Sequence, residues 1–372
     1  MEKEDVYMSI TLVLRGFVVL GVILMHTTWY FSHTRAESWV TLSEMVLDII
    51  SLFAVPLVMF VSGYMFISHN GHADHYKWPF FKKMFLSVFA PYVLFSLLYV
   101  GGAYLFANHG YSLHKVIYLL ATGSSAVHMG FFRALFGFYV IYPLLLRYFN
   151  NCRMKNRLPS FFIQMIFLQV GWKILNNIVF TDQYVLFLIG TTTFLRYIAY
   201  FTFGMAAATY YKQLLLWLDC NHGIIVGLFV ISLPAVIVCW IAKYYWHSYH
   251  FLDFVCFPLN LVLYTITIAM LFRHAHTLEA QDSLSKRFIM YLGNYSFGIF
   301  LIHIVFMYLG DRLLTYMHIT PVQVYFYPLL FVIMLSLSLL SMELLTKISW
   351  SHYLVGNVGK VSCHKHNEKF SE

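Results

Sequence analysis

The sequence predicts an all-α fold, a polytopic membrane bundle of about ten transmembrane helices with both termini in the cytoplasm. The composition is the first reason, because 60% of the 372 residues are hydrophobic and 11% are charged, whereas soluble domains carry about 25% charged residues. Several apolar stretches also reach the roughly 20 residues that cross a ~30 Å hydrocarbon core. Basic residues, finally, concentrate in alternate connections. A multi-pass protein of a cell membrane, with the lipid bilayer around it, is therefore expected.

The ten expected spans use nearly the whole chain. Their approximate ranges are 9–32, 41–67, 80–107, 130–149, 158–180, 188–211, 223–244, 251–272, 288–310 and 324–346. No connection is long enough for a soluble domain. We therefore expect one transmembrane domain over residues 1–350 and a polar cytoplasmic tail over residues 351–372.

The basic residues test this arrangement independently. The connections on the expected cytoplasmic side carry Lys77, Lys82, Lys83, Arg147, Arg153, Lys155, Arg157, Lys212, Arg273, Lys286 and Arg287. The connections on the other side carry only Arg35, Lys115, Lys243 and Arg312. This is the distribution that orients membrane proteins. The net charge of +8 therefore reflects topology, and no nucleic-acid partner is expected.

Cysteine and histidine spacing predicts no structural metal site. The five cysteines (Cys152, Cys220, Cys239, Cys256 and Cys363) are scattered without a CxxC pair, so we expect neither a disulfide framework nor a thiolate metal site. The run HNGHADHYK places His69, His72 and His75 in the first cytoplasmic connection. A polar loop is favoured over a zinc site there, and no bound metal is expected.

The first apolar stretch contains the segment RGFVVLGVILMH, in which His26 follows Arg15 by eleven residues. Three α-helical turns take about 10.8 residues, so the two side chains share one stripe, about 16 Å apart along the axis. Arg15 then lies near the cytoplasmic mouth and His26 deep toward the outer side. Ionisable groups in a membrane usually face the bundle interior or a water-filled cavity. Snorkelling of Arg15 and an interhelical hydrogen bond of His26 are the structural alternatives.

Four motifs in order resemble the acyltransferase-3 family of integral-membrane O-acyltransferases. They are the Arg15–His26 pair, VPLVMFVSGYMF (Val55–Phe66), HMGFFRALFGFYVIYPLLL (His128–Leu146) and YLGNYSFGIFLIHIVF (Tyr291–Phe306). The resemblance spans residues 10 to about 310. Among members of the family, this short chain is similar to those that modify exopolysaccharides and envelope glycans, polysaccharide intercellular adhesin included.

The resemblance implies an O-acyltransferase that moves an acetyl or succinyl group from cytoplasmic acyl-CoA to a hydroxyl of an extracytoplasmic glycan or lipid-linked saccharide. No permanently bound cofactor is expected, since acetyl-CoA or succinyl-CoA is a substrate. Arg15 would hold the cytoplasmic end of the donor. His26 would be the general base, because its ordinary pKa suits proton transfer near neutral pH. A transient acyl-histidine is the less favoured route. A second copy of the chain is a further candidate partner.

Glu44 and Asp48 are one helical turn apart on one face. Either could orient His26 and stabilise its protonated form, as the acid does in hydrolase triads. A carboxylate pair that reaches headgroup water is the alternative.

Other ionisable residues also gather on the expected outer half of the bundle. His128, Arg133, Lys173, Arg196 and His303 are the candidates for binding the acceptor or an acyl carboxylate. The three cations could instead face lipid phosphates, and His303 matches the late histidine of the family.

Four residues near the cytoplasmic side are candidates for the donor. Ser62 and Tyr64 end the second helix, where close helix packing is the alternative role. Lys82 and Lys83 precede the third helix, where the family often carries Arg-x-x-Arg at a different offset from the helix proline, here Pro91. A lysine is a point charge without the bidentate fork of arginine.

The alternative function is a polysaccharide exporter or proton-coupled transporter. Buried ionisable residues fit such a carrier too, and the 28 Tyr, 36 Phe and 8 Trp residues could stack on sugars. However, the sequence shows neither an inverted repeat nor paired helices broken by Gly or Pro.

Overall fold

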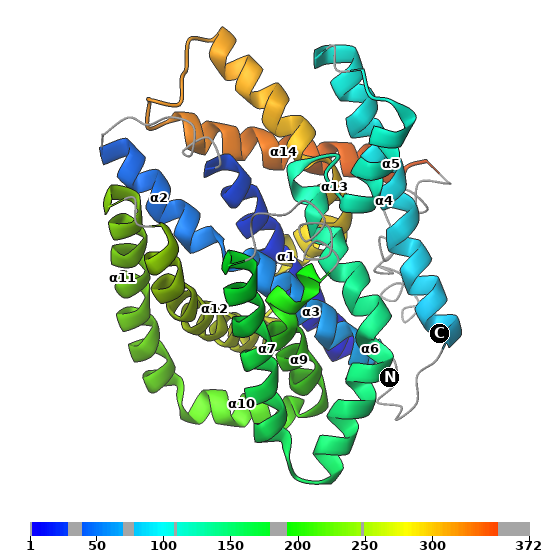
Figure 1. Ribbon diagram of the computed structural model, residues 1–372, viewed down its shortest axis with the longest axis vertical. Helices are drawn as coiled ribbons and strands as arrows, with labels where there is room; N and C mark the ends of the chain where they lie inside the picture. The colour runs from blue at the N-terminus through cyan, green and yellow to red at the C-terminus, as the bar shows by residue number, and fades with distance from the viewer. Residues whose placement is uncertain are drawn as a thin grey trace, which may run out of the picture.

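The computed structural model describes residues 2–28, 39–69, 78–107, 110–178, 192–246 and 249–348. Its elements are α1 (Glu2–Thr27), α2 (Trp39–Ser51), α3 (Ala54–His69), α4 (Trp78–Ala107), α5 (Leu113–Thr122), the 3₁₀ turn η2 (Val127–Met129), α6 (Gly130–Met154), α7 (Leu158–Ile178), the 3₁₀ turn η3 (Thr193–Tyr197), α9 (Ile198–Thr209), α10 (Tyr211–Cys220), α11 (His222–Trp246), α12 (Tyr249–Glu279), α13 (Leu284–Tyr316) and α14 (Phe326–Thr346). Figure 1 shows α1 and α3 in the middle of the bundle, with α10, α11 and α12 on one side and α4 and α5 on the other.

The predicted all-α membrane fold is confirmed, since the described ranges contain helices and no strands. Within these ranges, nine helical spans are long and apolar enough to cross a membrane. They correspond to nine of the ten expected stretches. The expected tail, 351–372, lies outside the described residues. The cytoplasmic location of the termini stays a prediction.

The tenth expected span, 188–211, is described from residue 192 onward. There η3 leads into α9, whose 12 residues rise only about 18 Å. Nine of them are buried, so the described part of this stretch is a core element of the bundle.

One candidate span, Leu42–Ser68, is made of two helices. A turn at Leu52 and Phe53 separates α2 from α3. Pro56, in the first turn of α3, has no N–H with which to bond the Leu52 carbonyl, whereas it is tolerated at a helix start. The break therefore gives α2, which carries Glu44 and Asp48, a direction independent of α3.

Two helix pairs in the core meet backbone to backbone through glycine. A Cβ at Gly16 would collide with the Ile289 carbonyl, and one at Gly293 would collide with the Leu12 carbonyl. In the same way Gly63 of α3 faces the Phe201 carbonyl of α9. Small residues permit such close helix packing in membranes, as was expected for the end of the second helix.

A disulfide joins Cys239 of α11 to Cys256 of α12, which corrects the expectation that the cysteines stay unpaired. The two residues are 17 positions apart in the sequence, with Cα atoms 5.9 Å apart. Neither motif nor spacing marks the pair, because the helix hairpin alone brings the cysteines together. Cys152 and Cys220 are free thiols.

The disulfide leads to a simple thiol-counting prediction. Changing Cys239 to serine removes one cysteine and frees Cys256, so a denatured, unreduced sample should label at one thiol more than wild type. Mass spectrometry after maleimide labelling measures this count. After reduction the order should reverse, with wild type labelling at one thiol more. Equal counts before reduction would contradict the pairing.

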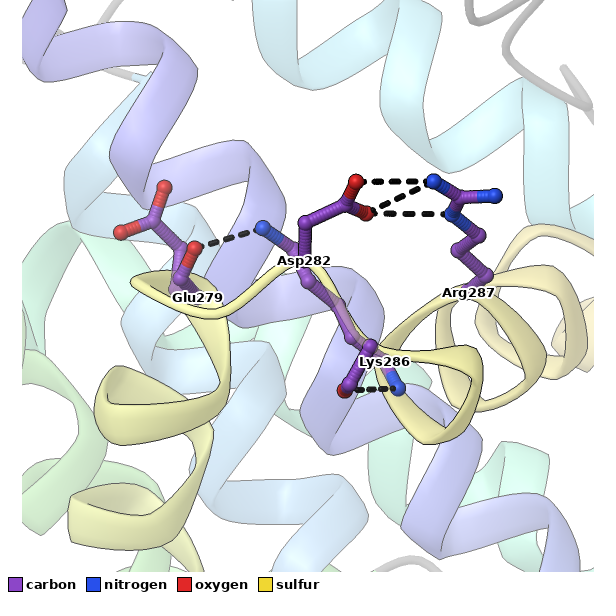
Figure 2. A network of polar contacts seen from close by, with 5 residues as sticks. Glu279, Asp282, Lys286 and Arg287 are labelled. Carbon is purple, nitrogen blue, oxygen red and sulfur yellow. Dashed lines mark hydrogen bonds and ion pairs between the residues drawn. The ribbon is translucent and has the colours of Figure 1, made fainter.

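Charged side chains form hydrogen bonds and an ion pair within the connection between α12 and α13 (Figure 2). Arg287 contacts both carboxylate oxygens of Asp282 at 2.9 and 2.8 Å, and Lys286 Nζ donates to the Glu279 carbonyl at 2.5 Å. The hydrogen bonds and charge of Arg287 hold the pKa of the Asp282 carboxyl below its ordinary value. Because both side chains are well exposed, the pair fixes local geometry more than it stabilises the fold.

Candidate functional site

Three histidines from distant parts of the chain form a buried cluster. His26 comes from the last turn of α1, His128 from η2 and His303 from the middle of α13. Ring centroids lie 4.9 Å apart for His26 and His303, 5.0 Å for His128 and His303, and 6.3 Å for His26 and His128. Their exposed fractions are only 6%, 4% and 0%. We call these residues the histidine cluster.

The chain between α5 and α6 positions His128. Gly123 ends α5 in the left-handed region (φ 61°), which glycine adopts at no steric cost. The Ser124 amide then donates to the Leu119 carbonyl at 2.9 Å, and the Tyr92 hydroxyl of α4 donates to the Leu120 carbonyl. These contacts fix the turn that brings His128 to the start of α6.

Aromatic side chains enclose the cluster. Tyr99 and Phe300 lie 5.3 and 5.4 Å from the His128 ring, and the Tyr99 hydroxyl donates to the Leu301 carbonyl at 2.8 Å. Water-poor surroundings of this kind strengthen electrostatic interactions between the enclosed groups. The sequence analysis missed both residues, although Phe300 lies one helical turn before His303.

The ring nitrogens of the cluster are sparsely bonded. Nδ1 of His303 lies 2.9 Å from the Phe300 carbonyl and 3.1 Å from the Ile299 carbonyl. Nε2 of His303 and both nitrogens of His128 are buried without a hydrogen-bond partner. Unpaired buried polar atoms are rare in folded proteins and call for an explanation, such as a catalytic role.

A polar seam between α1 and α13 connects the cluster to Arg15. Arg15 Nε donates to Ser296 Oγ at 2.8 Å, and His26 meets His303 further along the same two helices. Ser296 and His303 are seven residues apart, or about two turns, and share a face. This spacing is the signal that could have identified Ser296. The contact also shows that Arg15 bonds within the bundle.

The two carboxylates on α2 are not hydrogen-bonded to His26. Asp48 Oδ1 accepts from Thr28 Oγ1 at 3.2 Å, just beyond the end of α1. Glu44 is 2% exposed, and its Oε2 is buried without a partner. The group beside His26 is therefore a histidine, and an orienting role for Glu44 or Asp48 stays a prediction.

The expected acceptor-binding cations divide into two places. Arg133 lies in the first turn of α6, five residues after His128, with its Nε buried and unpartnered. Lys173 is half-buried on α7, and exposed Arg196 lies in η3 with its guanidinium 5.6 Å from the Tyr197 ring centroid. Arg133 thus belongs to the segment that carries His128, whereas the other two belong to the adjoining α7 and η3.

The expected donor-side residues show mixed environments. Ser62 Oγ donates to the Val58 carbonyl of its own helix at 2.8 Å. Tyr64 is fully buried, with its ring 5.7 Å from that of Tyr7 and its hydroxyl unpartnered. Lys82 is exposed at the start of α4, and the Lys83 side chain lies outside the described residues.

No described group of three or more His, Cys, Asp and Glu side chains has the geometry to hold a metal ion. The histidine cluster is therefore a set of closely spaced imidazoles among apolar side chains. Imidazole exchanges protons near neutral pH and also serves as a nucleophile. Proton transfer and acyl exchange are the two reactions that such a cluster can support.

Comparison with known proteins identifies one family. A family model described as an acyltransferase domain matches residues 13–343, and therefore both α1 and α13. No curated protein and no solved structure matches the chain.

Proposed function

The chain belongs to the acyltransferase-3 family, and from this premise we propose that it transfers an acyl group from acyl-CoA to a hydroxyl of an extracytoplasmic glycan or lipid-linked saccharide. That it is a multi-pass membrane acyltransferase follows from the family and the nine apolar spans. The donor, the acceptor, the bacterial cytoplasmic membrane and the catalytic base are the proposed parts.

The observation that carries the proposal is the histidine cluster, joined to Arg15 along one face of α1. The eleven residues between Arg15 and His26 rise about 16 Å, which is similar to the length of a pantetheine arm. Arg15 would bind a polar group at the cytoplasmic end of the donor, and the thioester would reach His26.

In the proposed reaction, His26 accepts the proton of the acceptor hydroxyl as that oxygen attacks the thioester carbonyl. Collapse of the tetrahedral intermediate expels the CoA thiolate, which takes the proton from His26. The new ester and free CoA leave, and His26 returns to its neutral form. General base catalysis by a positioned histidine contributes about 10²–10⁴-fold to such a step.

The surroundings of the cluster favour transfer over hydrolysis. Tyr99, Phe300 and the apolar walls restrict water around the three rings. Exclusion of water protects reactive intermediates from side reactions. His128 and Arg133 at the start of α6 are the proposed contacts for the acceptor, with an acetyl or succinyl group as the acyl unit.

Arg15 is expected to affect donor binding more than chemistry. Arg15→Ala should raise the KM for acyl-CoA by about 10-fold or more, since a charge-assisted hydrogen bond is worth about 1.5–3 kcal/mol. Steady-state kinetics of the purified protein measure KM and kcat separately. Ser296→Ala is the matched control, because it leaves the guanidinium and removes only its partner. An unchanged KM in the Arg15 variant would contradict the assignment.

Mass spectrometry of envelope polysaccharides tests the proposed function directly. Wild-type cells should carry a glycan heavier by one acyl unit than cells with a deletion of the protein, and the mass difference names the acyl group. Purified protein should release CoA only when the acceptor is present. Identical glycan spectra would contradict the proposed function, whereas unmodified glycan that accumulates inside the deletion cells would favour an exporter instead.

A further inference from the structure

The fold fixes the proton position of one ring in the histidine cluster. Nδ1 of His303 faces two carbonyl oxygens of its own helix, those of Phe300 and Ile299, at 2.9 and 3.1 Å. Carbonyl oxygens only accept hydrogen bonds, so Nδ1 must carry the proton. A neutral His303 then presents an unprotonated Nε2.

This Nε2 is an acceptor without a donor. His303 is completely buried, and its Nε2 has no hydrogen-bond partner. An unsatisfied buried acceptor costs about 1–3 kcal/mol. The His26 and His128 rings lie 4.9 and 5.0 Å away between centroids, so a ring N–H of either residue is a candidate donor to this lone pair. His26 is the one that shares α1 with Arg15. Catalytic hydrogen bonds in unliganded sites are often long and tighten with substrate.

A general base in a buried site needs a group that fixes its tautomer. In hydrolase triads a carboxylate accepts one imidazole N–H, which leaves the other nitrogen free as the base and stabilises the imidazolium. Asp48 bonds to Thr28, whereas His303 lies directly against His26. The Nε2 of His303 is therefore a neutral acceptor beside His26.

We propose that His303 is a positioning residue that accepts an N–H of His26 and thereby sets the other nitrogen of His26 as the base. The inference rests on the proposed function. His303 gains and loses no proton in the cycle. The proton travels from the acceptor hydroxyl to His26 and then to the CoA thiolate, while the His26–His303 hydrogen bond stabilises the imidazolium.

Paired substitutions at His303 test the role. A glutamine places its amide oxygen near the position of Nε2, whereas an asparagine reaches only the position of Nδ1. His303→Asn should therefore lower kcat by about 100-fold, within the range of general base effects, with the KM for acyl-CoA nearly unchanged. His303→Gln should retain at least about a tenth of the wild-type kcat, as expected for hydrogen-bond support without proton transfer.

The kcat values of the two His303 variants and of wild-type protein distinguish failure of the positioning role from failure of the proposed function. Equal losses in kcat for both folded variants would overturn the positioning role, and so would two variants with wild-type kcat. A lack of any acyl transfer by wild-type protein would instead refute the proposed function on which the inference rests, and full activity in a His26 variant would refute the assignment of His26 as the base.

A measurement on the unaltered protein covers the case in which the variants fail to fold. Nitrogen-15 NMR of protein labelled at histidine should show a neutral ring protonated at Nδ1, the less common form in water. Its signal should disappear in whichever His303 variant folds. A spectrum of wild-type protein without such a ring would overturn the inference.

Discussion

Replacing His26 by alanine is expected to reduce acyl transfer by at least about 10³-fold, within the range by which general bases accelerate proton transfer. The ring is 6% exposed, and its centroid lies 4.9 Å from that of His303 and 6.3 Å from that of His128. Alanine leaves no proton acceptor at this position. CoA release by detergent-purified protein, supplied with acyl-CoA and the acceptor glycan and followed continuously with a thiol reagent, measures the rate.

Two controls separate lost chemistry from lost folding. His222→Ala changes an exposed histidine at the start of α11 and should leave the rate within about twofold of wild type, as for surface changes away from a site. His26→Gln keeps most of the ring volume and should be as inactive as the alanine variant. Near-normal turnover in either folded His26 variant would rule out His26 as the base.

The second large effect is expected for Gly293→Ala in α13. A single Cβ there would collide with the carbonyl of Leu12 on α1, and a backbone atom cannot turn aside as a flexible side chain can. Overpacking of this kind costs about 1–3 kcal/mol. The two helices would separate, and with them the pairs Arg15–Ser296 and His26–His303, so both stability and turnover should fall.

Thermal unfolding followed by size-exclusion chromatography measures the change. The matched control is Gly227→Ala in α11, where a Cβ meets nothing within 4 Å. Alanine is the better helix former by about 1 kcal/mol, so the control should be neutral or slightly stabilised. Similar unfolding temperatures for the two variants would show that the α1–α13 contact tolerates a side chain.

The spacing of polar residues along α1 could be read from the sequence, whereas the residues that contact them could not. The eleven-residue spacing of Arg15 and His26 predicted one face and two depths. Which helix lies against that face depends on packing over the whole chain, since Arg15 and Ser296 are 281 residues apart. Charge alternation did predict similar depths for His26 and His303, but not that their rings touch.

The surroundings of Glu44 and Asp48 on α2 could not be predicted from their spacing in the sequence. Helical spacing put Glu44 and Asp48 on one face, and depth suggested that this face met His26. The turn at Leu52 and Phe53, next to Pro56, separates α2 from α3. The Asp48 carboxylate bonds to Thr28, two residues after His26, and spacing along α2 could not predict this contact. The Cys239–Cys256 bond escaped prediction for a related reason, because it depends on the geometry of one helix hairpin.

The contact between α1 and α13 can form only late in the synthesis of the chain. α1 leaves the ribosome first, yet Ser296 and His303 follow only after more than three quarters of the 372 residues have been made. Until then the glycine-lined surface at Gly16 has no partner, and His26 has no neighbouring imidazole from α13. A nascent chain that stalls before α13 therefore lacks both the partner of Arg15 and a complete histidine cluster.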